Sequence, residues 1–312
     1  MARPTVAGLT AADSIAPASP APGPDSPLDL PLDAHLHTDL SPDSDVPIDV
    51  HCALAAEHGI AELAITDHID FSPGSPACGY VDHATRERQV REAAERWAGR
   101  VAVRLGLEVT YERNREDEIR AWLARHRYDY IIGSVHVYRG SPYEATAVAS
   151  FTAGRSLAEI VAPYFDEVLA AIRSGLFDTI GHLDYVKRYL APHVRPAQLA
   201  AAPELLEPLL HALVETGVAL EVNSSGLRQV AGETYPAAAT VTRYRELGGR
   251  AVVAGSDSHA TWHFGVGLVD AYAILARAGF EELAFRRAPG SERVAIPVPR
   301  RFVPNGEPGG SL

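Results

Sequence analysis

Two histidines separated by a single residue, His35 and His37, stand just after the apolar residues 30–32. If this segment is a β-strand, alternate side chains point to the same face, so both imidazoles point the same way. Two imidazoles that converge at a strand end can begin a zinc site. Because the chain has 13 histidines, such a pair also arises by chance, and further ligands are needed to indicate a metal site.

Further candidate ligands follow the apolar runs of the chain. The runs that favour strands are residues 63–66, 101–107, 130–135, 179–181, 218–222 and 251–255. Most of these runs stop at residues that can bind a metal, namely His68, Glu108, His136, His182, and Asp257 with His259. A single histidine at such a place is better explained as a core residue bonded to a backbone carbonyl. That explanation does not account for a whole series of such residues.

Helical patterns separate these runs, at about residues 48–58, 83–98, 115–126, 157–174, 203–216, 236–247 and 269–278. Strands that alternate with helices predict βαβ units and a parallel sheet. Seven or eight such units in about 260 residues favour a closed barrel over an open sheet. In a barrel the carboxyl ends of all strands lie on one face, so the candidate ligands are expected to converge there. The helix at 269–278 is expected to complete the folded part.

Imidazoles and carboxylates together suit zinc, manganese or iron, and no cysteine belongs to the set, which argues against a structural thiolate site. The set is too large for one ion and therefore predicts two or three. A carboxylate such as Glu108 can bridge two of them.

Composition narrows the class of protein. The formal net charge of -12 argues against DNA or RNA as the main partner, because binding to a phosphate backbone needs a basic surface. No apolar run approaches the length of about 18 residues that a membrane span needs. The two cysteines, Cys52 and Cys78, are expected to be reduced thiols of a cytoplasmic protein. No secretory signal is expected at the N-terminus.

The expected domain organisation is one barrel domain at residues 28–303. Residues 1–27 are rich in alanine, proline, serine and glycine, which predicts a disordered tail. Residues 304–312 have a similarly loose composition.

The joint order of these motifs resembles the PHP (polymerase and histidinol phosphatase) family of metallophosphoesterases. The resemblance is carried by the short motifs that end at His37, His68, Glu108, His136, Asp184 and His259. It implies a distorted (β/α)7 TIM-like barrel and three divalent transition-metal ions (Zn, Mn or Fe). By resemblance, the ions divide the ligands into three sets: His35, His37, Glu108 and Asp257; Glu108, His136 and His182; and Asp43, His68 and His259. In part of the family the position of Asp43 is a histidine.

Residues 181–188 and 221–228 resemble the histidinol-phosphate phosphatase branch of the family. This resemblance implies a phosphoric monoester hydrolase of histidine biosynthesis that converts L-histidinol phosphate to L-histidinol and phosphate. It makes Arg188, Arg228 and Lys187 candidate phosphate contacts, since a guanidinium offers two parallel donors to phosphate oxygens. For Arg188 and Lys187, a solvated helix start is the alternative.

The mechanism hypothesis is attack on phosphorus by a hydroxide that bridges the two ions sharing Glu108, with Asp257 as a further catalytic residue. The proton for the leaving alkoxide would come from bound water or from a nearby acid, for which the candidates are His263, Asp184 and His193. The segment 137–155 is expected to be a loop over the site. Its residues Tyr138, Arg139 and Tyr143 could contact the substrate, and Glu144 or Asp70 could meet the substrate's ammonium group.

Two alternatives remain open at this stage. The first is a phosphoesterase acting on nucleotides or oligonucleotides, which would use the same metal ligands. The second is a non-catalytic, metal-stabilised binding domain, against which the complete ligand set argues. The sequence leaves the metal identity and the oligomeric state open.

Overall fold

The computed structural model describes residues 27–137 and 140–303. The expected tails at 1–27 and 304–312 lie outside these residues, apart from Pro27, and so do Tyr138 and Arg139 of the expected substrate loop.

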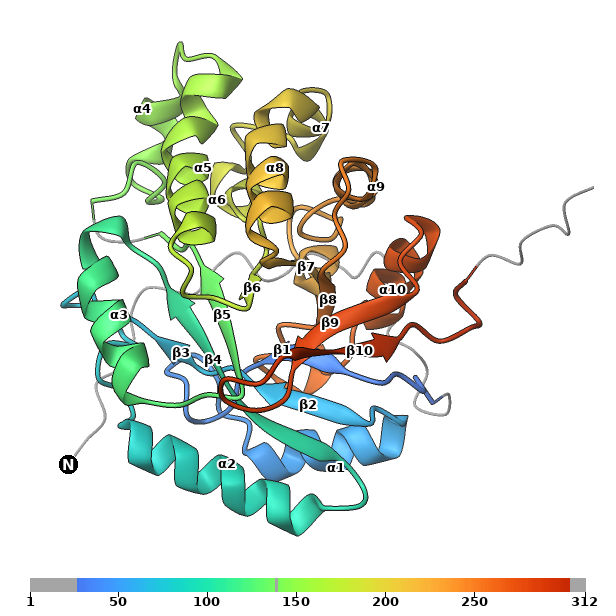
Figure 1. Ribbon diagram of the computed structural model, residues 1–312. Helices are drawn as coiled ribbons and strands as arrows, with labels where there is room; N and C mark the ends of the chain where they lie inside the picture. The colour runs from blue at the N-terminus through green and yellow to red at the C-terminus, as the bar shows by residue number, and fades with distance from the viewer. Residues whose placement is uncertain (1–26, 138–139, 304–312) are drawn as a thin grey trace, which may run out of the picture.

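A parallel sheet forms the centre of the molecule (Figure 1). Its hydrogen-bonded order is β1 (Asp33–Leu36), β2 (Glu62–Ile65), β4 (Ala102–Thr110), β5 (Tyr130–Ser134), β6 (Thr179–Ile180), β7 (Ala219–Asn223) and β8 (Val252–Gly255), while β3 (His68–Ile69) pairs with β4 off this path. All these pairs are parallel. The residues of β2, β5, β7 and β8 are buried throughout, as expected for parallel strands covered on both faces.

The two ends of the sheet meet and nearly close a barrel. The backbone N–H of Asp257, just after β8, donates to the carbonyl of His35 in β1 at 2.7 Å. The N–H of His37 donates back to the carbonyl of Ser258 at 2.9 Å. The predicted single-domain barrel with seven strands in sequence order is therefore confirmed, and its closure lies at the first histidine pair.

Helices connect and cover the strands. The longer ones are α1 (Ile48–His58), α2 (His83–Trp97), α3 (Glu116–Arg125), α5 (Leu157–Arg173), α8 (Glu207–Thr216), α9 (Ala238–Glu246) and α10 (Leu268–Arg277). Short turns of helix are α4 (Val148–Thr152), α6 (Val186–Leu190), α7 (Pro196–Ala200) and the 3-10 segments η1 (Arg113–Arg115), η2 (Pro203–Leu205), η3 (Ser224–Arg228) and η4 (Thr261–His263). Capping fixes several ends: Ser156 and Glu159 form a reciprocal capping box at the start of α5, and Gly59 ends α1 in the left-handed conformation.

Two expectations about elements were wrong. The segment 137–155 is not entirely a loop, because it contains α4. The fold does not end after α10, because β9 (Glu282–Arg286) and β10 (Arg293–Pro297) follow as an antiparallel hairpin.

The hairpin lies against the amino-terminal ends of the barrel strands, opposite the ligand-bearing ends. Phe285 packs on Tyr130 at the start of β5, with ring centroids 4.6 Å apart. Arg286 forms an ion pair with Asp178, just before β6, and Arg287 forms one with Glu62 at the start of β2. The hairpin thus packs on the amino-terminal ends of the strands and does not occupy the carboxyl ends, where the candidate ligands lie.

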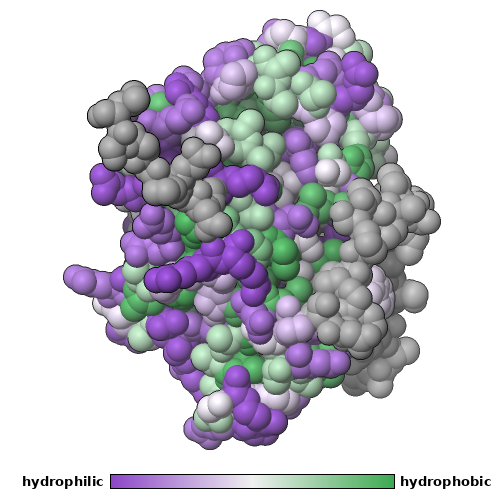
Figure 2. All heavy atoms as spheres, turned by 90° about the vertical axis from the view of Figure 1, so that its right-hand side faces the viewer, coloured by the Kyte–Doolittle hydropathy of each residue, from purple (hydrophilic) through white to green (hydrophobic). Residues whose placement is uncertain are grey.

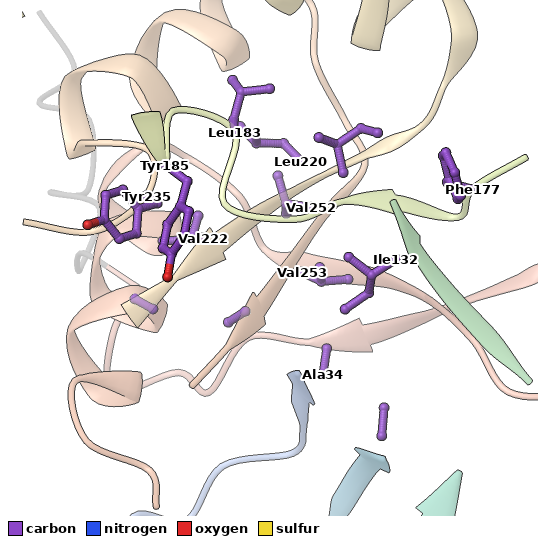
Figure 3. Close-up of a cluster of buried hydrophobic side chains, with 14 of the residues drawn as sticks. Ala34, Ile132, Phe177, Leu183, Tyr185, Leu220, Val222, Tyr235, Val252 and Val253 are labelled. Atoms are coloured by element: carbon purple, nitrogen blue, oxygen red, sulfur yellow. The ribbon is translucent and has the colours of Figure 1, made fainter. Parts of the chain in front are cut away.

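Apolar side chains fill the space around the strands, and Figure 3 shows part of this core, including Ile132, Val222, Val252 and Val253. The ring of Phe177 enters it over Gly133, where an added Cβ would lie 2.3 Å from that ring. The face seen in Figure 2 is mostly hydrophilic, with smaller hydrophobic groups between the polar ones. Among the described residues, no helix is both long and apolar enough to span a membrane.

Candidate metal centre

The structure brings all nine predicted metal ligands together. Seven of them lie in the carboxyl half of a barrel strand or within four residues after it, His68 is the first residue of the short strand β3, and Asp43 comes from the loop after β1. The convergence follows from the parallel sheet, because every strand end of this kind opens on the same face.

The first set is fully interior. Nε2 of His35 lies 3.1 Å from Nε2 of His37. Oε2 of Glu108 lies 3.3 Å from the first of these nitrogens and 3.4 Å from the second. Oδ1 of Asp257 lies 3.4 Å from Nε2 of His37. All four side chains are buried.

The second set uses the other oxygen of the same carboxylate. Oε1 of Glu108 lies 2.9 Å from Nε2 of His182 and 3.6 Å from Nε2 of His136. The two imidazole nitrogens are 3.3 Å apart. Oε2 of Glu108 also lies 3.0 Å from Nδ1 of His68, a member of the third set. Glu108 therefore presents one oxygen to the second set and the other to the first and third sets, as a bridging ligand would.

The third set lies nearer the surface. Oδ2 of Asp43 is 3.3 Å from Nε2 of His68 and 3.2 Å from Nε2 of His259. The side chains of Asp43, His259 and His68 are 35%, 25% and 13% exposed, against 0% for those of His35 and His37. An ion bound by this set would be more accessible to solvent than an ion bound by the first set.

The orientation of the imidazoles fits metal ions. A carboxylate or carbonyl oxygen can only accept, so Nδ1–H of His35 donates to Glu221 at 2.7 Å and Nδ1–H of His259 donates to the carbonyl of Asp257 at 3.0 Å. In the neutral form that binds a metal ion, each ring would then present the lone pair of Nε2 to the interior. Oε2 of Glu108 is buried without a hydrogen-bond partner. Converging nitrogen and oxygen lone pairs are the donor set that zinc, manganese or iron requires.

Electrostatics keep the carboxylates in the form that binds cations. Burial raises the pKa of Glu108, but the charges of His35 and His68 outweigh it and hold the pKa well below its usual range. The pKa of Asp257 is lowered in the same way, chiefly by His35 against the cost of burial. Burial and the neighbouring rings of His259 and His68 hold the pKa of His37 well below its ordinary value. The first set thus combines anionic oxygens with a neutral imidazole.

Backbone strain marks two of the ligands. His182 has φ 25° and Asp257 has φ 54°, values that residues with a Cβ adopt rarely. Such conformations persist where surrounding contacts enforce them, and they are common at functional sites.

The predicted phosphate contacts differ in their surroundings. Nη2 of Arg228 donates to the carbonyl of Asp257 at 2.5 Å, and its Nη1 is buried without a partner. Arg188 donates to the hydroxyl of Tyr185, whose ring centroid lies 4.4 Å from that of His182. The guanidinium of Arg228 therefore contacts a candidate ligand residue directly, whereas that of Arg188 is linked to one through Tyr185.

Lys187 does not fit the same role. Its ammonium is buried and lies 2.8 Å from Asp184 and 2.7 Å from Glu233. Both negative charges already neutralise it, so the structure favours a structural role for Lys187. Of the three candidate leaving-group acids, Asp184 is paired with Lys187, His193 is exposed and His263 lies in η4.

Tyr143 is also placed differently from the expectation of a substrate contact. It is buried, its hydroxyl donates to the carbonyl of Ile160 at 2.7 Å, and its ring packs on Phe151. Glu144 accepts from the backbone of Gly140, and Asp70 accepts from Ser75. These contacts belong to the loops and give no independent sign of substrate binding.

Sequence reasoning missed the residues that hold the ligands in place. Glu221 and Asn223 of β7 contact His35 and Asp257, and Thr110 bonds Nδ1 of His136 at 2.9 Å. A signal for Glu221 was present, since a charged residue within an apolar strand is almost never buried without a partner.

Comparison with known proteins agrees with this geometry. Residues 33–225 match the family model of the PHP domain. The chain belongs to the PHP domain family. The "Probable histidinol-phosphatase" of Deinococcus radiodurans is 30% identical over 266 residues, covering 81% of this chain and 96% of that protein. The "Histidinol-phosphatase" of Lactococcus lactis is 26% identical, covering 81% of this chain and 93% of that protein.

A solved PHP structure shares the fold. The crystal structure of histidinol phosphate phosphatase from Lactococcus lactis, complexed with zinc, L-histidinol and phosphate, superposes with a TM-score of 0.72. The match covers 85% of this chain and 98% of that protein, at 24% sequence identity. The resemblance expected from the motifs is therefore confirmed for both the family and the barrel.

Proposed function

We propose that this PHP protein is a metal-dependent phosphomonoesterase that hydrolyses L-histidinol phosphate to L-histidinol and phosphate. The observation that carries the proposal is the nine-residue ligand cluster in which Glu108 presents one oxygen to each of two sets. Two curated relatives that carry the name histidinol-phosphatase align over almost their whole length and support the choice of substrate.

Three divalent ions would occupy the three sets, with Glu108 shared by the first two. When bound, such ions supply positive charge to the phosphoryl oxygens and lower the pKa of bound water towards neutrality. The donor atoms form three overlapping groups, which share His37 and His68, and this grouping supports more than one ion. Zinc, manganese and iron all suit the mixed nitrogen and oxygen donors.

The chain's own side chains position the phosphate. Nη2 of Arg228 is held by the carbonyl of Asp257, and its buried Nη1 has no hydrogen-bond partner among the described residues and could donate to a phosphate oxygen. Arg188 is held by the ring and hydroxyl of Tyr185, next to His182 of the second set. Charged hydrogen bonds from two guanidinium groups would orient the phosphoryl group and stabilise its negative charge during transfer.

The test is phosphate release from L-histidinol phosphate by protein loaded with manganese, zinc or iron, beside a panel of nucleotides and sugar phosphates. We expect kcat/KM for histidinol phosphate to exceed that for every other substrate by at least about 100-fold, because the leaving group contributes specific contacts. A higher kcat/KM for a nucleotide would reassign the substrate and retain the metal centre. The absence of any metal-dependent turnover would refute the proposal.

A further inference from the structure

Glu221 stands at the middle of a buried hydrogen-bond network behind the metal ligands. It lies in β7, its side chain is 0% exposed, and none of the three ligand sets includes it. Along β7 the side chains alternate, so Glu221 and Asn223 share one face and Leu220 and Val222 the other. A buried carboxylate in a strand needs a reason, because its desolvation is costly.

The two oxygens of Glu221 accept hydrogen bonds from residues of two different ligand sets. Oε1 accepts from Nδ1–H of His35 at 2.7 Å. Oε2 accepts from the backbone N–H of His182 at 2.7 Å and from the side-chain amide of Asn223 at 3.1 Å. The same amide of Asn223 also donates to Oδ2 of Asp257, at 3.3 Å. One carboxylate is therefore tied to three metal-ligand residues.

The neighbouring backbone makes room for this carboxylate. An added Cβ at Gly255 of β8 would lie 2.4 Å from Oε1, and one at Gly181 would lie 3.4 Å from Oε2. Gly181 directly precedes His182, whose φ of 25° is strained. The hydrogen bond from the N–H of His182 to Glu221 helps to hold that conformation and hence the direction of its imidazole.

We infer that Glu221 is a positioning residue that sets the tautomer of His35 and the backbone of His182, and thereby the metal affinity of the first two sets. A carboxylate on Nδ1–H of a ligating histidine fixes its tautomer and makes Nε2 a better donor, and loss of such a partner typically costs about 10- to 100-fold in metal affinity. The negative charge of Glu221 also adds to the charges of Asp43, Glu108 and Asp257 in balancing the cations.

Glutamine at this position cannot reproduce the network. It has the same shape, but it offers one accepting oxygen and an NH₂ that only donates. If the oxygen faces the N–H of His182, the NH₂ faces Nδ1 of His35, which must then accept. His35 would carry its proton on Nε2, where the lone pair for the metal is needed.

The experiment compares wild type with Glu221→Gln and a matched control, Glu62→Gln. Glu62 is also a buried glutamate in a barrel strand, but it pairs with Arg104 and Arg287 at the opposite end of the barrel. Metals bound per chain are measured at rising chelator concentration, and the melting temperature is measured for metal-free and metal-loaded protein. A third variant, Glu221→Asp, keeps the charge and should retain more metal than Glu221→Gln.

We expect Glu221→Gln to release metal at a chelator activity at least about tenfold lower than wild type, and to lose most of the stabilisation that metal gives. Glu62→Gln should lower the melting temperature of both forms without changing metal release. If Glu221→Gln retained metal like wild type, or merely lowered both melting temperatures equally, the inference would be wrong.

The inference rests on the proposed metal centre but not on the proposed substrate. If the protein bound metal normally but did not turn over histidinol phosphate, only the proposed function would be contradicted. A wild-type protein that bound no metal would overturn both.

Discussion

Glu108 and His182 lie 74 positions apart in the chain, yet Oε1 of the first is 2.9 Å from Nε2 of the second. The other oxygen of Glu108 lies 3.3 Å from Nε2 of His35. A single buried carboxylate therefore joins the ends of β1 and β4 and the turn after β6, and it is the central ligand of the site.

Replacement of this carboxylate tests the centre directly. Glu108→Gln removes the negative charge and turns one of the two accepting oxygens into a donor that faces imidazole nitrogens. We expect kcat/KM to fall by more than about 100-fold and fewer ions to be retained, as measured by phosphate release and by elemental analysis. Near-normal turnover with a full metal complement would contradict the bridging role.

Removal of metal should be stepwise. The side chains of Asp43 and His259 are 35% and 25% exposed, whereas those of the first set are nearly inaccessible. We expect a chelator to remove the ion of the third set first, so that elemental analysis gives a plateau at two ions per chain. The Asp43→Asn variant should hold only two ions per chain before any chelator is added. Simultaneous loss of all ions from wild type would exclude the graded arrangement.

Arg228 should contribute to phosphate binding. Arg228→Met removes the buried Nη1 that has no protein partner. Since a hydrogen bond to a charged group contributes about 1.5–3 kcal/mol, we expect kcat/KM to fall about 10- to 100-fold and product inhibition by inorganic phosphate to weaken. Arg88→Met, at a site where the arginine is 59% exposed on α2, is the control and should change neither quantity. Unaltered inhibition by phosphate in Arg228→Met would argue against this contact.

Lys187 should instead affect stability. Lys187→Met leaves the buried carboxylate of Asp184 without its cation, and breaking a buried pair in this way typically costs about 3–5 kcal/mol. Denaturant unfolding of metal-loaded protein measures the loss. The double variant Lys187→Met/Asp184→Asn should recover part of it, because no buried charge is then left unpaired. If the Lys187→Met protein were stable and had a raised KM, Lys187 would be a phosphate contact and not a structural residue.

The two thiols should differ in reactivity. Cys52 is buried, and this burial raises its pKa to about 12, whereas Cys78 is exposed. At pH 8 only about one Cys52 thiol in 10⁴ would be ionised, since each pH unit below the pKa lowers the thiolate fraction tenfold. We expect a thiol reagent to modify one cysteine rapidly in folded protein and both after denaturation. Cys78→Ser should abolish the rapid phase, and equal rates for both thiols would disprove the difference.

The sequence by itself determined the barrel and predicted its candidate ligands. Apolar runs that stop at His68, Glu108, His136 and His182 indicate both the strands and the polar residues at their ends, because parallel strands bring these ends to one face. The resemblance to the family then divided the ligands into sets, a division that stays a prediction, since His68 of the third set also lies 3.0 Å from Oε2 of Glu108.

The tertiary structure decided how each polar group is neutralised. Lys187 and Arg188 are neighbours with similar charge, but burial places the first between Asp184 and Glu233 and the second against Tyr185 beside the site. The structure alone showed that the partners of Glu221 are His35 and His182, and that the β9–β10 hairpin meets charged residues at the strand starts. Such partners are distant in the sequence, and the local pattern of one segment does not contain them.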